Sequence, residues 1–286
     1  SDVYKRQVTA IRMATLNAAE CFDLKDRGAI APGYRADVVL LDDLKDFHVN
    51  RVFIQGALVA EEGKYLPEIK RYDISTVKGS VIVKDFSAEK FKMHLKSNKV
   101  NVIKILPGGV VTAKDTAEIQ LDENGEFVRN PEEDIVKVAV VERHQGTGNV
   151  ACGFLKGYGI KAGAVALSIA HDSHNIIVVG VSDEEMEFAV NSLIAQEGGM
   201  VLVREGKVLE SMPMPIAGLM SDQSGEWVDE KLTAIHAKAY EELGIAGDVE
   251  PVMTLCFMSL AVIPEVKLTD MGLFDVTTFS FIPVEA

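Results

Sequence analysis

The apolar residues near the start of the chain first recur at helical spacing and then at the spacing of strands. Over residues 8–25 they lie three or four positions apart, which predicts an amphipathic helix, and Gly28 follows as a stop signal. The apolar run 38–41 predicts a strand, and a second β element over 49–65 turns at Gln55–Gly56. We therefore expect a small β subdomain that cannot bury both of its faces alone.

Beyond residue 73 short strands predominate, with helix signals among them. The segment "SDEEMEFAVNSLIAQEGG" has Ser182 and Glu185 at capping-box spacing and apolar residues along one helical face. A second amphipathic helix is predicted over 226–243, and another helix near 88–96. Strands are predicted over 80–83, 100–106, 110–112, 134–143, 164–170 and 175–181, with hairpins over 121–128 (turning at Asn124–Gly125) and 200–210. Together these elements predict the α+β class.

The composition is that of a globular protein with an acidic surface. Of 286 residues, 48% are hydrophobic and 25% are charged, and 29 basic against 43 acidic residues give a formal charge of −14. Such a charge repels phosphate backbones and anionic lipid, so we expect neither nucleic acid nor a membrane as a partner. Three isolated cysteines fit neither a disulfide framework nor a metal knuckle, which indicates a reducing cytoplasm.

The first seven residues, "SDVYKRQ", are similar to a translated transposon end of the kind used in sequencing libraries. They run without a break into the predicted helix. We therefore treat residues 1–7 as a non-native scar, leave them out of the fold prediction and expect the natural protein to extend further towards its N-terminus.

The densest group of ionisable side chains is "HDSH", in which His171, Asp172 and His174 follow an apolar run. Such groups are costly there unless they have a use. In a loop at a strand end they could line a ligand pocket, bind a divalent metal or present acid–base groups to a substrate. Alternatively, Asp172 caps the next turn and the histidines bind loop backbone. Two ligands do not complete a metal site, so pocket lining is the favoured interpretation.

A second group, Glu142, Arg143 and His144, ends another predicted strand and precedes the glycine-rich segment "QGTGN". Strand ends hold side chains rigidly over a crevice, so this layout is typical of functional sites. A Glu–Arg surface pair beside a turn fits the same residues equally well. If this strand end lies beside the one that bears His171, we expect three imidazoles to converge.

Three other features favour structure over chemistry. The glycines between 148 and 163 lack Walker spacing and a following Lys–Ser/Thr pair, so they predict turns. Two prolines and Gly218 in "PMPIAGLMSD" predict an extended segment that turns sharply. Cys152 and Cys256 lie in apolar contexts without an adjacent base, so we expect packed thiols rather than nucleophiles.

Several longer motifs resemble one known family. The segment "ATLNAAECFDLKDRGAIAPGYRADVVLLDDL" is similar to the end of an amidohydrolase-superfamily chain, where the last barrel helix returns into a β subdomain. The segments "VVERHQGTGN", "AHDSHNIIVVG", "MPMPIAGLMSD" and "MTLCFMSLAVIPEVKLTDMGLFDV" together resemble the C-terminal half of bacterial adenine deaminases. These motifs occur in order and cover the chain from about residue 8 to its end.

The resemblance implies how the chain is divided. Residues 8–27 would be the last helix of a truncated (β/α)8 barrel, residues 28–72 the small β subdomain, and residues 73–286 a mixed α/β C-terminal domain. In this family a pair of divalent metals, manganese or iron, activates water at the barrel. The metal ligands and the proton-shuttling carboxyl group belong to the missing barrel, so we expect the residues present to bind no metal pair and no other cofactor.

The resemblance further implies hydrolysis of adenine to hypoxanthine and ammonia in cytoplasmic purine salvage, by a homo-oligomer, with this fragment alone inactive. Adenine and the chain's own N-terminal barrel are the expected partners. We assign His171, Asp172 and His174 to the lining of the adenine pocket, with Glu142 and His144 behind them. Two alternatives stay open: a non-catalytic lid or assembly domain of a related amidohydrolase, and a different amidohydrolase with the same C-terminal domain.

Overall fold

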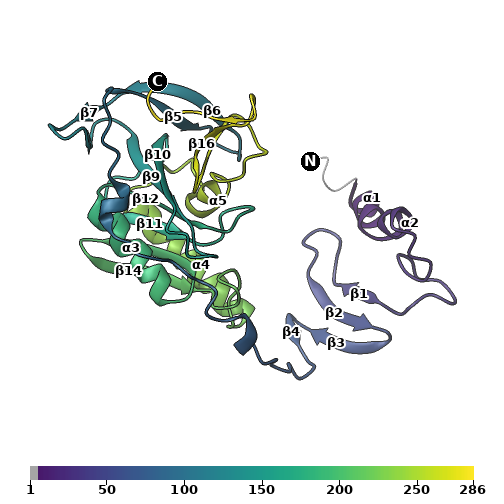
Figure 1. The fold of residues 1–286 in the computed structure, drawn as a ribbon. Coiled ribbons are helices and arrows are strands. Elements are labelled where there is room, and N and C mark those ends of the chain that lie inside the picture. The colour runs from purple at the N-terminus through teal and green to yellow at the C-terminus, as the bar shows by residue number, and fades with distance from the viewer. Residues whose placement is uncertain (1–5) are drawn as a thin grey trace. The chain divides into compact units, whose positions relative to one another are not determined.

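The computed structural model describes residues 6–286, so residues 1–5 of the expected scar lie outside the described residues. The chain divides into two compact units between Tyr72 and Asp73. Figure 1 labels most of the helices and strands of both units. No helix within residues 6–286 is long and apolar enough to cross a membrane.

The first unit combines a short helical segment with a four-stranded antiparallel sheet in the order β1-β2-β3-β4. The helix predicted over 8–25 is present from residue 7 to residue 21, with a π-helical stretch in its middle. Gln55 and Gly56 have φ values of 51° and 79° and form the predicted tight turn. The elements are α1 (Gln7–Arg12), the π-helix η2 (Met13–Asn17), α2 (Ala18–Cys21), β1 (Val38–Leu41), β2 (Val49–Ile54), β3 (Ala57–Glu61) and β4 (Lys64–Tyr65).

The second unit is built on an eight-stranded sheet in the order β14-β13-β11-β12-β9-β10-β5-β6. Neighbouring strands are antiparallel except β10 and β5, which are parallel. This mostly antiparallel sheet, accompanied by a few helices, confirms the predicted α+β class. The strands are β5 (Lys99–Ile105), β6 (Thr112–Glu118), β9 (Ile135–Val141), β10 (Val150–Lys156), β11 (Ala164–Leu167), β12 (Ile176–Gly180), β13 (Gly199–Arg204) and β14 (Lys207–Pro213).

Two smaller sheets complete this unit, and one of them is the hairpin predicted over 121–128. Gly125 has a φ of 78° and provides the turn of that hairpin. The hairpin predicted over 200–210 is present as β13 and β14 of the large sheet. The smaller strands are β7 (Gln120–Leu121) with β8 (Phe127–Val128), and β15 (Val266–Thr269), β16 (Gly272–Asp275) and β17 (Ser280–Phe281).

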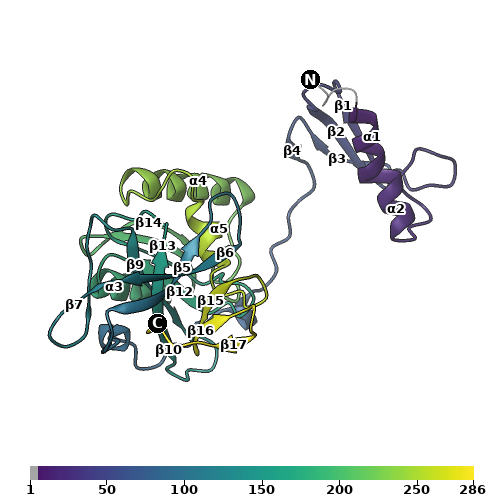
Figure 2. The ribbon, with the colours of Figure 1, turned by 90° about the horizontal axis from the view of Figure 1, so that it is seen from above.

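Both faces of the large sheet are covered, because residues of its central strands alternate between two hydrophobic clusters. In β9, Val138 and Val140 join the cluster that contains residues of α4 and α5, whereas Ala139 and Val141 join the cluster that contains residues of α3. Figure 2 shows α3 and α4 on opposite sides of these strands. The ends of the central strands are therefore held in a packed layer. The helices are α3 (Asp183–Ala195), α4 (Gly225–Glu241) and α5 (Pro251–Cys256).

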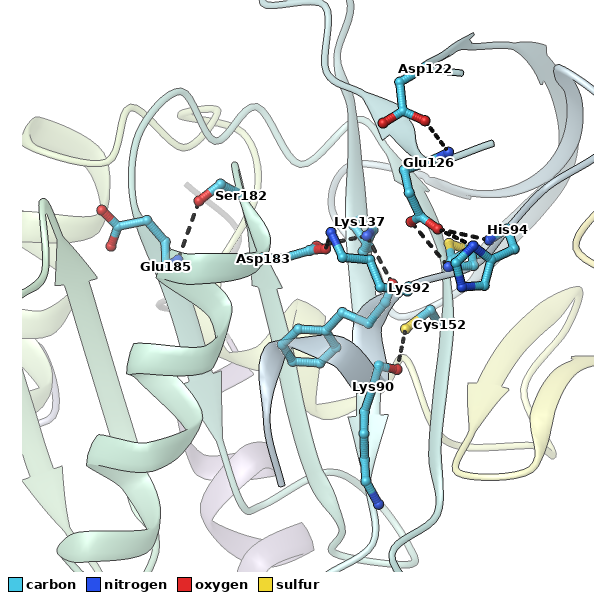
Figure 3. A network of polar contacts seen from close by, with 12 residues as sticks. Lys90, Lys92, His94, Asp122, Glu126, Lys137, Cys152, Ser182, Asp183 and Glu185 are labelled. Carbon is cyan, nitrogen blue, oxygen red and sulfur yellow. Dashed lines mark hydrogen bonds and ion pairs between the residues drawn. The ribbon is translucent and has the colours of Figure 1, made fainter. Parts of the chain in front are cut away.

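Ser182 caps α3 as predicted, but the capping box is only half formed. Its hydroxyl accepts from the backbone N–H of Glu185 at 3.3 Å (Figure 3). The Glu185 carboxylate instead accepts from the N–H of Glu205 at 2.6 Å, in the turn between β13 and β14. Glu185, which the sequence predicts to complete the cap, therefore links the start of α3 to the hairpin of β13 and β14.

The helix predicted near 88–96 is wrong, because only the 3-10 turn η4 (Ala88–Phe91) forms there. Other side chains bind the backbone groups that a helix would pair internally (Figure 3). Lys137 Nζ donates at 2.9 Å to the carbonyl of the last residue of the turn, and the Glu126 carboxylate accepts from the N–H groups of residues 93 and 94 at 3.2 and 3.1 Å. Tertiary contacts thus replace the local helix.

Two predicted strands are also wrong. Residues 80–83 form no strand, although Ile82 N–H donates to the Arg143 carbonyl at 2.7 Å, and the strand expected over 110–112 starts only at Thr112, as β6. The sequence of β6 is "TAKDTAE", which is mostly polar because β6 is an edge strand with one face in solvent. Pairing with β5, rather than hydrophobicity, makes this segment a strand.

Lys267 on β15 is a fully buried lysine whose ammonium group donates to the Val110 carbonyl at 3.0 Å. Burial lowers its pKa from 10.5 to about 8. The unfolded chain therefore binds the proton more tightly than the folded chain does. Burial of the charge destabilises the domain below about pH 8, and this cost declines as pH rises from there towards 10.5.

We expect Lys267→Met to raise the free energy of unfolding by about 2 kcal/mol at neutral pH, because an apolar side chain of similar length has no charge to desolvate. The gain should shrink above pH 8. Urea unfolding at neutral and alkaline pH measures both effects, with Lys207→Met at an exposed position as the control. A variant that is less stable at both pH values would show that the hydrogen bond to Val110 outweighs the cost of burial.

Candidate functional site

The two groups of ionisable residues lie together at one edge of the large sheet. The last residue of β9 is paired with the first residue of β12 in their antiparallel ladder. His144 Nε2 lies 2.7 Å from the Ser173 carbonyl oxygen. Segments 142–144 and 171–174 are therefore side by side, which is the arrangement that the hypothesis of converging imidazoles requires. His144 itself contacts the backbone of the other segment, and its side chain is exposed.

Glu142 fixes the loop that carries His144. Its buried carboxylate accepts from the N–H groups of His144, Gln145 and Thr147 at 2.5, 2.8 and 2.9 Å, and from the Thr147 hydroxyl at 3.1 Å. Burial by itself raises the pKa of Glu142, but these hydrogen bonds outweigh it and lower the pKa to about 2. Glu142 is therefore a permanent anion near neutral pH, and its contacts suit positioning of the loop rather than proton transfer.

Arg143 lies beneath the histidine loop, residues 171–174, and is completely buried. Its guanidinium donates to carbonyls of three separate segments: His174 at 2.5 Å, Ala217 at 3.2 Å and, in a longer contact, Ser80 at 3.5 Å. Burial lowers the pKa of Arg143, yet a guanidinium stays protonated at neutral pH. The buried side chain does not form the surface ion pair considered as an alternative.

The sharp turn at Gly218 makes room for this cation. Gly218 has a φ of 72°, and a Cβ atom there would lie 2.6 Å from a guanidinium nitrogen of Arg143. The Gly218 carbonyl accepts from Ser168 Oγ at 2.6 Å, and the same hydroxyl accepts from Gly199 N–H at 2.7 Å. The segment "PMPIAGLMSD" therefore turns sharply, as its prolines and glycine predict, and it packs against the Arg143 side chain.

The imidazoles of His171 and His174 are in contact, with ring centroids 5.6 Å apart in a T-shaped arrangement. The His171 ring also lies 4.8 Å from the Phe257 ring, and its backbone N–H donates to the Cys256 carbonyl at 2.8 Å. The end of α5 thus supports the loop. His174 has a φ of 54°, and its N–H donates to the Ala170 carbonyl at 2.6 Å.

The His174 ring is partly buried, and its Nδ1 atom is buried without a hydrogen-bond partner within residues 6–286. Desolvation lowers the pKa of His174, and the neighbouring His171 and Arg143 lower it further, while Asp172 opposes them. The Asp172 side chain is 82% exposed. The loop therefore presents a neutral imidazole beside an exposed carboxylate.

Asn175 and Asn149, which the sequence analysis does not select as site residues, tie the two segments at this edge of the sheet to the turn between β15 and β16. Asn175 is buried, accepts from Arg143 N–H at 3.3 Å and donates to the Asp270 carboxylate at 3.2 Å. Asn149 donates to the other carboxylate oxygen of Asp270 at 3.4 Å. Only the position of Asn175 directly after the histidines in "HDSHN" could have indicated this contact from the sequence, because Asp270 lies far away along the chain.

Two family models match the chain in succession. A model described as the adenine deaminase C-terminal domain matches residues 109–280. The chain belongs to this family. A model described as the amidohydrolase family matches residues 6–59. The resemblance seen in the sequence motifs is thereby confirmed.

Curated relatives extend the match to nearly the whole chain of this family member. Adenine deaminase 2 of Desulfotalea psychrophila is 66% identical over 98% of the chain. Adenine deaminase of Ligilactobacillus salivarius is 49% identical over 97% of it, and adenine deaminase 2 of Carboxydothermus hydrogenoformans is 48% identical over 96%. The chain spans 48% of the length of each of these relatives.

The family match and the curated relatives imply a metal-dependent family. Within residues 6–286 no group of three or more His, Cys, Asp or Glu side chains is placed to hold a metal ion. The buried Nδ1 of His174 and the fully hydrogen-bonded carboxylate of Glu142 are poor ligands. The residues present therefore do not fit a divalent metal pair.

Cys152 and Cys256 of this family member contribute to packing, as the sequence predicts. Cys256 is buried and Cys152 is partly buried, whereas Cys21 is exposed. Burial raises the pKa of both Cys152 and Cys256 to about 12. Both thiols therefore stay protonated and are poor nucleophiles.

Proposed function

We propose that this chain is the C-terminal part of an enzyme that hydrolyses adenine to hypoxanthine and ammonia in purine salvage in the cytoplasm. The observation that carries the proposal is the extent of the similarity: a relative named adenine deaminase 2 shares 66% identity over 98% of the chain. The chain spans only 48% of that relative, so the activity belongs to the intact protein and the piece alone is inactive.

In this proposal the metal chemistry lies outside the chain. A pair of divalent metals, manganese or iron, would supply activated water for the deamination. Residues 6–286 contain no ligand group for such a pair, so we assign it to the N-terminal barrel of the intact protein. The task of the residues present is to bind and orient the purine.

The first unit supports a barrel partner. Within residues 6–72 only Ala19 is buried, while Phe22 and Ile30 are 76% and 90% exposed. A helix and a small sheet with so little buried surface need a further surface to cover their apolar side chains. The N-terminal barrel fits this role, because the amidohydrolase match covers residues 6–59. Association into a homo-oligomer would cover more of the same surface.

The histidine loop, in this proposal, faces the barrel and completes the adenine pocket. His174 offers a neutral imidazole, His171 a ring that packs on Phe257, and Asp172 an exposed carboxylate. Behind them, His144 contacts the Ser173 carbonyl of the histidine loop, and Glu142 fixes the segment that carries His144. Adenine is a flat, uncharged heteroaromatic base, so its recognition needs hydrogen bonds and ring contacts rather than neutralisation of charge.

A non-catalytic lid or assembly role is the second candidate. It is favoured by the internal contacts at this edge of the sheet, since the hydrogen bonds that Glu142 and Arg143 make within residues 6–286 join them to groups of the same unit. A loop fixed in this way could seal a barrel mouth without touching the substrate. The two candidates predict different rates of deamination when the His174 imidazole is removed.

A chimera that joins the N-terminal half of the Desulfotalea relative to this chain tests the proposal. We expect the chimera to release ammonia from adenine, and His174→Ala to lower its kcat/KM by at least about tenfold, because a positioned donor or acid–base group is lost. The melting temperature should change little. His94→Ala, on an exposed side chain of the same domain, is the matched control and should leave turnover unchanged.

The outcomes separate the candidates. Loss of melting temperature with normal turnover would favour a purely structural loop. A normal melting temperature together with normal turnover of the His174→Ala chimera would favour the non-catalytic lid. Rapid deamination by this chain without a barrel would contradict the assignment of the metal chemistry to the N-terminal barrel.

A further inference from the structure

We infer that the histidine loop presents His174 as a neutral imidazole with its proton on Nε2, a state set by the buried Arg143 guanidinium, and that this N–H group donates to a lone-pair atom of the bound base. The identity of the base rests on the proposed function. The tautomer concerns this chain alone and can be tested without any deamination.

The environment of Nδ1 selects the tautomer. Nδ1 is buried and has no hydrogen-bond partner within residues 6–286. A proton on this atom would be an unsatisfied buried donor, whereas a bare lone pair there is an unsatisfied acceptor. The Arg143 guanidinium donates to the His174 carbonyl at 2.5 Å, so its positive charge lies close to the residue and acts on the ring. A positive charge favours the lone pair and disfavours the N–H dipole, so the proton resides on Nε2.

The groups around the ring keep it uncharged. His171, Arg143 and His144 all oppose a positive charge on His174, and partial burial opposes it most. Asp172 is an acidic neighbour that raises the pKa of His174, but its side chain is 82% exposed, so water screens it. A fixed cation under the loop therefore outweighs a screened anion beside it.

The donor is also held in place. The His174 N–H is bound to the Ala170 carbonyl and the His174 carbonyl is bound to Arg143, so both peptide groups of the residue are fixed. The His171 ring contacts one side of the imidazole. Of the two ring nitrogens only Nδ1 is among the buried atoms without a partner, which leaves Nε2 for a ligand. A fixed, neutral N–H donor suits an in-plane ring nitrogen of a heteroaromatic base better than an anion or a cation.

Histidine NMR on this chain tests the tautomer. Long-range proton–nitrogen spectra of the 15N-labelled chain report which ring nitrogen carries the proton. We expect His174 in the Nε2–H form at neutral pH and a titration midpoint below the 6.5 of an unperturbed histidine. A proton on Nδ1, or an imidazole of His174 that is charged at neutral pH, would overturn the inference.

Variants of Arg143 test the cause. Arg143→Met should raise the midpoint of the His174 titration and give a mixture of tautomers, whereas Arg143→Lys keeps the charge and should keep the Nε2–H form. If far-UV circular dichroism shows that Arg143→Met does not fold, His171→Gln provides the second test, because it removes another neighbour that lowers the pKa of His174. A midpoint that moves in neither variant would overturn the role of the neighbouring charges.

Two substitutions in the chimera test the ligand contact. Gln keeps an N–H donor near the place of Nε2, and Leu removes it. We expect His174→Leu to raise the KM for adenine by about tenfold and His174→Gln to recover most of this loss. Equal losses would overturn the donor role. Normal kinetics in both variants, combined with the Nε2–H spectrum, would refute the contact between His174 and adenine and leave the tautomer standing, whereas a chimera that releases no ammonia even with His174 in place would count against the proposed function.

Discussion

Residues 73–286, expressed without the first unit, are expected to fold and to unfold in urea at the same midpoint as in the full chain, whereas residues 6–72 alone are expected to stay unfolded. All three clusters of buried apolar side chains lie beyond residue 73. In the first unit only Ala19 is buried among the described residues. Because burial of apolar surface supplies most of the free energy of folding, a unit without a core cannot offset the loss of chain entropy.

Circular dichroism and urea unfolding of the two pieces, with the full chain as control, measure this difference. Limited proteolysis adds an independent readout, because residues 66–74 carry neither helix nor strand and should be cut first. A cooperative unfolding transition for residues 6–72 would contradict the prediction. Loss of structure in residues 73–286 would show that the first unit supports the larger one.

The elements that the hydrophobic periodicity predicted correctly are those that bury one whole face, or their whole length, in the core of the domain. α3 has Met186, Ala189, Val190 and Leu193 buried along one face, and β9 is buried over its whole length. The wrongly predicted elements depend instead on partners far away along the chain. The helix expected near 88–96 is replaced by contacts to Lys137 and Glu126, which lie about 30 to 50 residues away, and β6 is a strand because of its neighbour β5. No local pattern reports such partners.

The same contrast applies to the candidate site. Both strands are predicted from local patterns, whereas the adjacency of their ends was only a hypothesis. The N–H groups that donate to Glu142 lie within five residues of it, so the segment "ERHQGT" contains both the carboxylate and its donors. Arg143 gave no such signal. Its partners Ser80, His174 and Ala217 come from three distant segments, and only the folded chain brings them together.

Glu142→Gln is expected to lower the free energy of unfolding of the domain by about 3 kcal/mol at neutral pH. The carboxylate accepts four hydrogen bonds, and the amide NH2 of glutamine would face N–H donors on one side. The pKa of about 2, against 4.5 for an unperturbed glutamate, corresponds to a stabilisation of this size. Because the folded-state pKa is lowered, the stabilisation is complete above pH 4.5 and is lost as pH falls towards 2.

The pH dependence distinguishes this account from a simple packing defect. Urea unfolding of the wild-type chain and of Glu142→Gln should differ most above pH 4.5, and the two curves should converge as pH falls towards 2. Glu132→Gln, on an exposed loop, is the matched control and should change stability little at any pH. A constant difference across the whole range would mean that the variant disturbs packing. In that case the charge of Glu142 would have no part in holding the loop that carries His144.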